Sequence, residues 1–343
     1  RVLSGKYSRA LSGTPQAMDK KKAAFYLAQG PYNQALGLWY AGEKFSPEAK
    51  ADVEAKVATM IDVYKSRLQT ADWLAPETRE KAITKLNVIT PHIGYPEKLP
   101  ETYDKKIIDE NLSLVENAQK LVEISIAHSW SKWNKPVDRS EWHMPAHMVN
   151  AYYDPQQNQI VFPAAILQAP FYDIAQSSSA NYGGIGAVIA HEISHAFDTN
   201  GASFDENGSL KNWWTEDDYA AFKERTDKIV DQFEGLDSYG AKVNGKLTVS
   251  ENVADLGGVA CALEAAKRDE DFSVREFFIN FATIWRTKAR EEYMQMLASV
   301  DVHAPAKWRT NVIVTNFDEF HKEFDVKEGD GMWRAPEDRV IIW

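Results

Sequence analysis

The sequence lacks the features that mark several large protein classes. It has a single cysteine, Cys261, so no disulfide can form within the chain. This fits a reducing compartment or a protein that is stable without disulfides. No run of apolar residues approaches the roughly 18 that a membrane-spanning helix needs, so we expect no membrane span in this segment. Basic residues are also scarce, because 39 Lys and Arg stand against 50 Asp and Glu. The net charge of −11 argues against a nucleic-acid-binding protein.

Length and composition are those of an ordinary globular protein. The 343 residues allow two domains or one large one. Hydrophobic residues make up 44% and charged residues 26% of the chain, which excludes a disordered or fibrous protein. The chain starts at Arg1, and the residues that follow lack the parts of a signal peptide. We therefore expect a fragment or a processed product, with further residues before Arg1.

The first 133 residues have a mostly helical pattern. Ser46 and Pro47 predict a helix start, with Ser as N-cap and Pro at the first helical position. The apolar residues that follow at steps of three and four are Val53, Val57, Met60, Tyr64 and Leu68. A second helix should open at Pro76, and a third should cover about 111–133. The residues of the third helix that we expect to face inward are Leu114, Ala118, Leu121 and Val122.

After Pro136, strand patterns join the helices. Residues 148–162 predict a β-hairpin, because strand-forming residues lie on both sides of a polar turn. Further helices are expected near 187–197, 215–233, 250–267 and 273–290. The sequence therefore predicts a mainly α fold with a small β-sheet. We place the boundary between a helical segment, 1–135, and a second domain, 136–343, at this change of pattern.

The motif that carries chemistry is His-Glu-Ile-Ser-His at 191–195. Residues four apart lie on one face of a helix, so both imidazoles can bind one metal ion. Glu192 lies beside that face, where it can act as general base on a water that the metal activates. The apolar run 186–190 would bury the helix and leave its polar face towards a cleft. The alternative, a surface helix with two idle histidines, fits this context less well.

A third zinc ligand is not next to the motif. A catalytic zinc typically takes three protein ligands, but Gly201 and Trp214 stand where two other zincin subclasses have theirs. Further along, Glu251 and Asp255 are four apart and share one helical face. Glu251 can be the third ligand, and Asp255 can accept the second ring N–H of a ligand histidine. The alternative is a solvated acidic first turn behind Ser250 as N-cap.

Two adjacent glycines, Gly257 and Gly258, follow on the same predicted helix. Each costs about 1 kcal/mol relative to alanine inside a helix. They therefore predict a close approach of another helix at this point.

These motifs resemble the neprilysin family of zinc endopeptidases, which includes the endothelin-converting enzymes and the bacterial oligoendopeptidases of the O type. The matching segments are 93–96, 149–153, 181–186, 191–198, 204–208, 212–214, 251–258 and the terminal Trp343. They cover nearly the whole chain, and the set is highly specific. The resemblance implies a zincin-type catalytic lobe plus part of a helical second lobe, with one Zn²⁺ per chain.

The resemblance also implies roles for residues of the two motifs. His191, His195 and Glu251 would be the zinc ligands. Glu192 would be the general base, and Asp255 would be the partner that orients a ligand histidine. These roles agree with those that the spacing alone favours.

Further residues would bind the substrate and stabilise the reaction. The resemblance implies that His303 stabilises the oxyanion and that Arg309 grips a substrate carbonyl or C-terminal carboxylate. Asn150 and Ala151 would bind the substrate backbone, which suits an extended peptide added to a strand edge. The residues that would line an apolar pocket beyond the scissile bond are Phe171, Val188 and Trp285. Without the resemblance, His303 would be interpreted as a loop histidine and Trp285 as helix core.

The predicted function is the zinc-dependent hydrolysis of short peptides, with a preference for large apolar residues after the scissile bond. In the implied mechanism, zinc polarises the carbonyl and lowers the pKa of the attacking water. Glu192 passes the proton to the leaving amine, and His303 helps zinc to stabilise the oxyanion. One alternative is a catalytically weak fragment that binds zinc and peptides and needs a separate N-terminal chain. Another is a structural helical protein that binds no metal.

The chain departs from the family pattern in three ways. It lacks the several cysteines of the animal members, so we expect a bacterial-type, cytoplasmic protein. Secretion or anchoring through a missing N-terminus is the alternative. Ala187 replaces a larger residue beside the pocket, which leaves the pocket size open. Family members are also much longer, so the missing N-terminal part of the same protein is an expected partner, in addition to peptide substrates.

Overall fold

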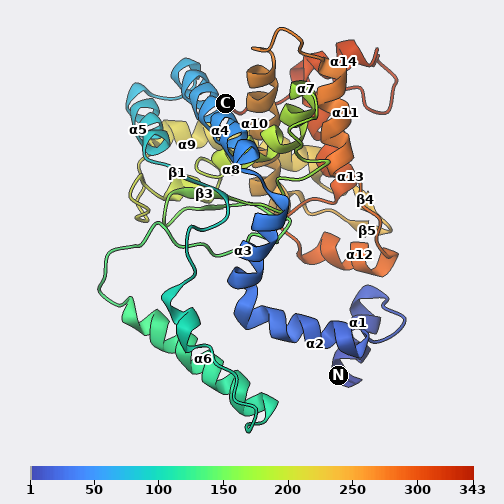
Figure 1. Cartoon of the computed structure of the whole chain (residues 1–343). Helices are drawn as coiled ribbons and strands as arrows, with labels where there is room; N and C mark the ends of the chain where they lie inside the picture. The colour runs from blue at the N-terminus through green and yellow to red at the C-terminus, as the bar shows by residue number, and fades with distance from the viewer. Residues whose placement is uncertain (1) are drawn as a thin grey trace.

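The computed structural model describes residues 2–343, and helices dominate it, as predicted (Figure 1). The α-helices are α1 (Val2–Ser12), α2 (Lys20–Gln29), α3 (Asn33–Lys44), α4 (Pro47–Thr70), α5 (Pro76–Asn87), α6 (Leu114–Ser131), α7 (Ser178–Asn181), α8 (Ala187–Ser194), α9 (Glu216–Phe233), α10 (Gly245–Ala266), α11 (Val274–Ile284), α12 (Glu291–Val300), α13 (Ala306–Asn311) and α14 (Asp318–Glu323). The strands are β1 (Thr90–Gly94), β2 (Tyr152–Asp154), β3 (Gln159–Pro163), β4 (Asp237–Ser238) and β5 (Ala241–Lys242). A π-helical turn, η3 (Tyr182–Gly186), leads directly into α8.

The centre of the fold is the contact between α8 and α10, and α4 and α9 pack around this pair. Helix α8 is buried along its whole length. Gly258 of α10 lies so close to α8 that an added Cβ would be 2.8 Å from His191 N and 2.9 Å from Ala187 O. A Cβ on Gly257 would likewise lie 2.6 Å from Ser194 Oγ. The close helix approach that the glycine pair predicts is confirmed.

The long helix α4 forms as predicted. Ser46 caps its start by accepting a hydrogen bond from Ala49 N at 3.1 Å. The apolar stripe from Val53 to Leu68 is buried, and α4 packs against α5, α8 and α10. The Tyr64 hydroxyl donates to the carbonyl oxygen of Ala190, 3.1 Å away. Helix α4 therefore ties an early part of the chain to the helix that carries the metal-binding motif.

The main sheet is larger than the predicted hairpin because it includes β1. Strand β3 is central, with β2 antiparallel on one side and β1 parallel on the other. The sequence pattern does not indicate β1, because the segment is short and Pro91 interrupts it. Strand β2 begins at Tyr152 rather than near 148, so Asn150 and Ala151 come just before it. Since β2 is an edge strand, one of its sides is free of strand partners within this sheet.

The surroundings of helix α6 differ from the prediction. The helix forms, but the residues expected to face inward do not do so. Leu114 is 66% exposed and Val122 is 55% exposed. Ala118 is also exposed, and Leu121 is only half-buried. The segment leaves the main body after β1 and therefore finds little there to pack against.

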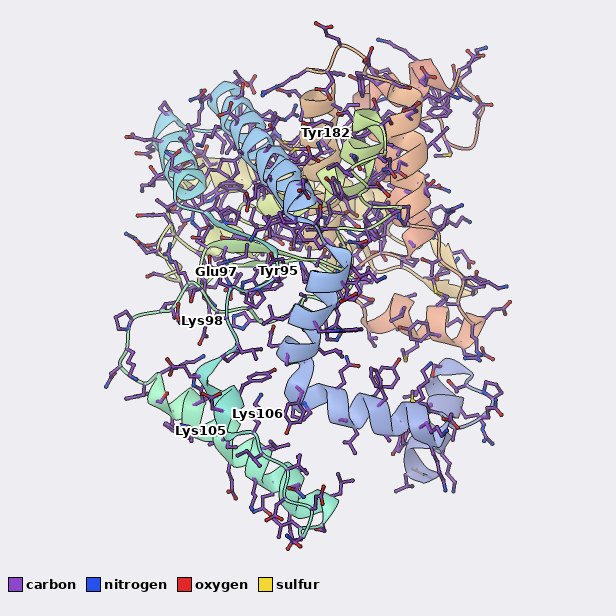
Figure 2. The ribbon with its side chains drawn as sticks, viewed as in Figure 1. Tyr95, Glu97, Lys98, Lys105, Lys106 and Tyr182 are labelled. Atoms are coloured by element: carbon purple, nitrogen blue, oxygen red, sulfur yellow. The ribbon has the colours of Figure 1, made fainter. Side chains whose placement is uncertain are left out.

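Helices α1, α2 and α6 lie below the main body in Figure 1, and α3 connects α2 to it. In Figure 2, side chains project around α6 on all sides, and Lys105 and Lys106 mark the turn before it. The apolar side chains of α6 that are more than half exposed are Leu114, Val115, Val122, Ile126 and Trp130. None of the helices within residues 2–343 is both long and apolar enough to cross a membrane.

Helix α10 begins earlier than predicted. Its N-cap is Asn244, whose Oδ1 accepts a hydrogen bond from Leu247 N at 3.0 Å, so the prediction of Ser250 as N-cap is wrong. Glu251 and Asp255 consequently lie inside the helix, and Asp255 is only 3% exposed. This excludes the alternative of a solvated acidic first turn. Helix α11 in turn ends at Ile284, before the predicted 290.

Gly258→Ala should lower the free energy of unfolding by about 1–3 kcal/mol, since the new methyl group would press on backbone atoms of α8. Gly42→Ala in α3 is the matched control, because a Cβ there meets nothing within 4 Å. That change should be neutral or stabilise the protein by up to about 1 kcal/mol. Denaturant unfolding of both variants checks the prediction, and equal midpoints would contradict it.

Candidate metal centre

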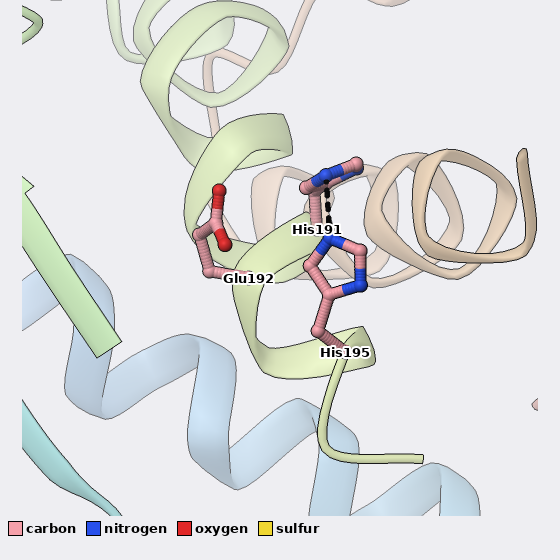
Figure 3. A group of neighbouring side chains, drawn as sticks. All are labelled: His191, Glu192 and His195. Atoms are coloured by element: carbon pink, nitrogen blue, oxygen red, sulfur yellow. Dashed lines mark hydrogen bonds between the residues drawn. The ribbon is translucent and has the colours of Figure 1, made fainter. Parts of the chain in front are cut away.

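Helix α8 carries His191 and ends at Ser194, before the predicted 197, so that His195 is its C-cap. Both histidines of the motif point to the same side of the helix (Figure 3). The Nε2 atoms of His191 and His195 lie 3.0 Å apart. Glu192 points from the neighbouring side of the helix, and it is 6% exposed. The buried apolar residues of α8 fix the helix, so its polar side faces the cleft, as the sequence predicts.

Helix α10 brings a carboxylate to the two histidines. Glu251 Oε2 lies 3.3 Å from His191 Nε2 and 3.6 Å from His195 Nε2. It is also 3.1 Å from Nε2 of His303, which lies in the segment after α12. Glu251 Oε2 is buried and has no well-aligned hydrogen-bond donor. A buried carboxylate oxygen that has no donor of its own and lies beside two ring nitrogens is suited to bind a metal ion.

The three atoms fit a tetrahedral metal ion. Bonds of about 2.0–2.1 Å at tetrahedral angles separate neighbouring ligand atoms by about 3.3–3.4 Å, and the separations here are 3.0, 3.3 and 3.6 Å. Glu192 is a competing third ligand, since one of its oxygens lies within 4.8 Å of nitrogens of both histidines. The shorter distances favour Glu251 as ligand and leave Glu192 beside the ion.

Two further carboxylates contact the outer ring nitrogens of the histidines. Asp255 Oδ1 lies 2.8 Å from His191 Nδ1, although the two groups are not well aligned for a hydrogen bond. Asp198 Oδ2 lies 2.6 Å from His195 Nδ1. Such partners fix the ring orientation and raise the basicity of a ligand histidine. Asp198 is absent from the sequence-based set, because it lies in the loop after α8, where helical spacing gives no signal.

The Asp198 carboxylate is itself held in place. Its Oδ1 accepts hydrogen bonds from the backbone N–H groups of Asn200 at 2.8 Å and Gly201 at 2.7 Å. Ser250 Oγ donates to Oδ2 at 2.5 Å. The Ser250 hydroxyl therefore links α10 to the loop that follows α8.

The site carries surplus negative charge. Its four carboxylates face a single guanidinium, so the formal charge is −3 while the imidazoles are neutral. The carboxylates are those of Glu192, Asp198, Glu251 and Asp255, and the guanidinium is that of Arg309. A divalent cation would offset most of this charge, which is a second reason why a metal fits.

Burial and neighbouring charged groups shift the pKa values of three residues of the site. Burial raises the pKa of Glu192 above its ordinary value. Burial acts in the same direction on Glu251, but contacts with the three histidines prevail and lower its pKa. The contact with Glu251 in turn raises the pKa of His303. A buried glutamate with a raised pKa beside the metal position is suited to accept and release a proton.

Arg309 lies at the back of the cleft. It is 7% exposed and binds Asp255 through both arms, with Nε 2.7 Å from Oδ2 and Nη2 2.6 Å from Oδ1. Burial raises the pKa of Asp255, but Arg309 and His191 together outweigh this effect and the pKa falls to about 2. The guanidinium also stacks on Trp285, 3.9 Å from the ring centre. Arg309 therefore faces the cleft while it neutralises the partner of His191.

All twelve residues in the sequence-based set line one cleft of about 480 Å³. They come from four regions of the chain: 150–151, 171–195, 251–255 and 285–309. Phe281 and Ile284, which the sequence did not single out, line the cleft together with Phe171, Val188 and Trp285. Asn150 is exposed beside the free edge of β2, and Ala151 is buried.

Comparison with known families finds two matches. A model of peptidase family M13 matches residues 150–340, and a model of the N-terminal part of the same family matches residues 1–96. The first match contains every residue that lines the cleft except Val149.

Two curated relatives are similar over most of the chain. A neutral endopeptidase of Lactococcus lactis subsp. lactis is 53% identical over all 343 residues. A Streptococcus gordonii protein, whose name describes a zinc metalloproteinase in the scaA 5′region, is 80% identical over 277 residues, which are 81% of this chain. The chain covers 54% and 49% of these two relatives and therefore spans about half their length.

Two solved structures share the fold. The crystal structure of PEPO from Lactobacillus rhamnosis HN001 superposes with a TM-score of 0.95 at 42% identity, over 99% of this chain and 54% of that one. The Mycobacterium tuberculosis zinc metalloprotease ZMP1 in complex with inhibitor gives a TM-score of 0.93 at 38% identity, over 100% of this chain and 55% of that one.

Glu251→Gln should strongly weaken zinc binding, because it keeps the shape of the side chain and removes the charge of the third ligand. Zinc content after dialysis, expected near one ion per unaltered chain, measures the effect. Glu264→Gln is the matched control, because Glu264 lies on the same helix but pairs with Arg67 outside the cleft. Full zinc content in Glu251→Gln would show that another carboxylate is the ligand.

Proposed function

The chain belongs to peptidase family M13, and from this premise we propose that it is a zinc-dependent endopeptidase acting on short peptides. The observation that carries the proposal is the set of three ligand atoms on α8 and α10, 3.0–3.6 Å apart, beside the buried carboxyl of Glu192. The names of the relatives support the same chemistry, since they describe neutral endopeptidases and zinc metalloproteinases.

His191, His195 and Glu251 would hold one Zn²⁺. When bound, the ion would supply a Lewis acid that polarises the scissile carbonyl and acidifies the attacking water. Asp255 and Asp198 keep the two imidazoles oriented for this role through their outer nitrogens.

Glu192 is proposed as the general base. Its carboxyl is buried beside the ligand face and makes no ion pair in the described structure that would hold it ionised at low pH. It would accept the proton of the attacking water and deliver it to the leaving amine, so that one residue serves both transfers.

His303 and Arg309 are proposed to act on the substrate. His303 is held by Asp301, whose Oδ1 lies 2.9 Å from Nδ1, and its Nε2 points to the ligand cluster. An imidazole with a raised pKa in that place can donate to the developing oxyanion. Arg309 would reach a carbonyl or carboxylate on the leaving-group side while its other atoms stay on Asp255.

The substrate class follows from the edges of the cleft. Asn150 and Ala151 continue the free edge of β2, so an extended peptide could add to it by backbone hydrogen bonds. The apolar part of the cleft favours a large apolar side chain after the scissile bond. Its residues are Phe171, Val188, Phe281, Ile284 and Trp285. We keep the division into a helical segment, 1–135, and a catalytic domain, 136–343, as part of the proposal.

We also propose a cytoplasmic location. Cys261 is the single cysteine and is buried, so the fold forms without a disulfide, which fits a reducing compartment. Fractionation of the source cells decides this point.

A second candidate is a fragment that binds zinc and peptides but turns over slowly until an N-terminal part of the same protein joins it. The exposed apolar side chains of α6 favour this candidate, because patches of that kind usually mark an interaction surface. The half-length match to the relatives agrees with it.

Glu192→Gln should keep the zinc and lose the chemistry. The residue is placed as base and not as ligand, so metal content should match that of the unaltered chain. Removal of a general base typically costs 10²–10⁴-fold in rate, and hydrolysis of a short fluorogenic peptide measures it. Cleavage at the original rate with zinc bound would rule out this role for Glu192.

The apolar stripe of α6 should cause the isolated chain to self-associate. Val122→Lys together with Ile126→Lys places charges on the stripe and should give a monomer in sedimentation velocity. Ala127→Lys together with Ser131→Lys adds the same charge at two exposed positions on the opposite side of α6 and should leave self-association unchanged. A monomeric unaltered chain at the same concentration would contradict the need for a partner.

A further inference from the structure

Lys85 is a buried lysine of α5 whose ammonium group reaches the segment that follows His195. The residue is 1% exposed. Its Nζ donates to three backbone carbonyl oxygens, those of Ala196 at 2.8 Å, Gly201 at 2.8 Å and Phe204 at 2.7 Å. An ammonium has three N–H donors, so these acceptors match its charged form. Among the described residues, none of those lining the cleft lies on α5, so any effect of Lys85 on the site is indirect.

The three carbonyls bracket Asp198, which contacts His195 Nδ1. Ala196 precedes Asp198, whereas Gly201 and Phe204 follow it. The loop between them turns sharply, since an added Cβ on Gly201 would lie 1.7 Å from His195 O. The same turn aims the N–H of Gly201 at Asp198 Oδ1, 2.7 Å away. A single ammonium therefore holds both sides of the loop that presents Asp198.

Groups around the ammonium of Lys85 partly offset the cost of burying its positive charge. Three aromatic rings lie 5.8 Å from Nζ, namely those of Tyr153, Phe197 and Trp213. Burial lowers the pKa of Lys85 to about 7, and the carboxylates of Asp198, Asp205 and Glu206 act in the opposite direction. The three carbonyl dipoles add to that opposition, because they point their negative ends at the ammonium.

We propose that Lys85 is a positioning residue for the metal centre, which fixes the loop 196–204 so that Asp198 meets His195. The inference rests on the proposed zinc site. It assigns to α5, which lies far from the motif in sequence, a role in retaining the ion. The three carbonyls leave no donor of Lys85 free for a substrate, so its contribution is confined to the geometry of the loop.

The test is the rate at which zinc leaves the full chain for a chromogenic chelator. Lys85→Met removes the donors and keeps most of the volume, and it should speed zinc release about tenfold. This is the lower end of the 10–100-fold loss found when a partner of a metal-ligating histidine is removed. Lys85→Gln keeps two N–H donors and should have a smaller effect in the same direction. It carries the test if Lys85→Met does not fold.

Arg67→Met is the matched control. Arg67 is also a largely buried cation that binds a backbone carbonyl, that of Trp343, and it pairs with Glu264 outside the cleft. Its loss should lower the unfolding midpoint and leave zinc release unchanged. Equal acceleration by Lys85→Met and Arg67→Met would reduce the effect to general destabilisation and overturn the inference.

Asp198→Asn shows whether Lys85 acts through that carboxylate. The single change should speed zinc release, and adding Lys85→Met to it should cause no further acceleration. A tenfold effect of Lys85→Met that persists in the Asp198→Asn background would overturn the proposed route. If the unaltered chain holds no zinc, the proposed function fails. If it holds zinc and Lys85→Met releases it at the original rate, only the present inference fails.

Discussion

The contact between α8 and α10 is the constraint on which the site depends. The candidate ligands are divided between the two helices, and the ligand atoms lie within 3.6 Å of one another only because the backbones touch. Gly258 leaves no room for a side chain against His191 N, and Gly257 leaves none against Ser194. Two glycines in a helix interior cost about 1 kcal/mol each. That cost is offset because the close approach of the helices lets the Glu251 carboxylate reach both imidazoles.

Once the helices are this close, the buried charges must be satisfied locally. A buried carboxylate without partners would cost several kcal/mol. Asp255 is matched by both arms of Arg309, and Asp198 by two backbone N–H groups and the Ser250 hydroxyl. Each of these partners is itself fixed by backbone or by packing. These contacts hold the two histidines in fixed orientations, so little rearrangement is left to oppose metal binding.

The sequence indicates the candidate ligands of the metal centre better than it indicates the residues that hold those ligands in place, and the reason is physical. The motif at 191–195, Glu251 and Asp255 obey helical spacing, so local periodicity suffices to place them on shared faces. Loop 196–204 follows no period, and the contacts of Asp198 and Lys85 arise only when α5 packs beside it. For helix α6 the local structure is predicted correctly and the packing is not. Its apolar stripe predicts the helix correctly, but a stripe does not state which surface covers it, and none of the described elements does so.

Part of the first 133 residues holds later elements of the chain in place. Helix α4 binds the Ala190 carbonyl of α8 through Tyr64, α5 binds the loop after α8 through Lys85, and β1 extends the sheet beside the cleft. These three elements lie within 47–94 and have buried, specific contacts with the later part. Helices α1, α2 and α6 have no comparable polar anchors to the site. The helical pattern over the first 133 residues therefore covers two kinds of segment. One stretch packs into the part of the fold that carries the candidate metal centre, and the other keeps apolar side chains exposed.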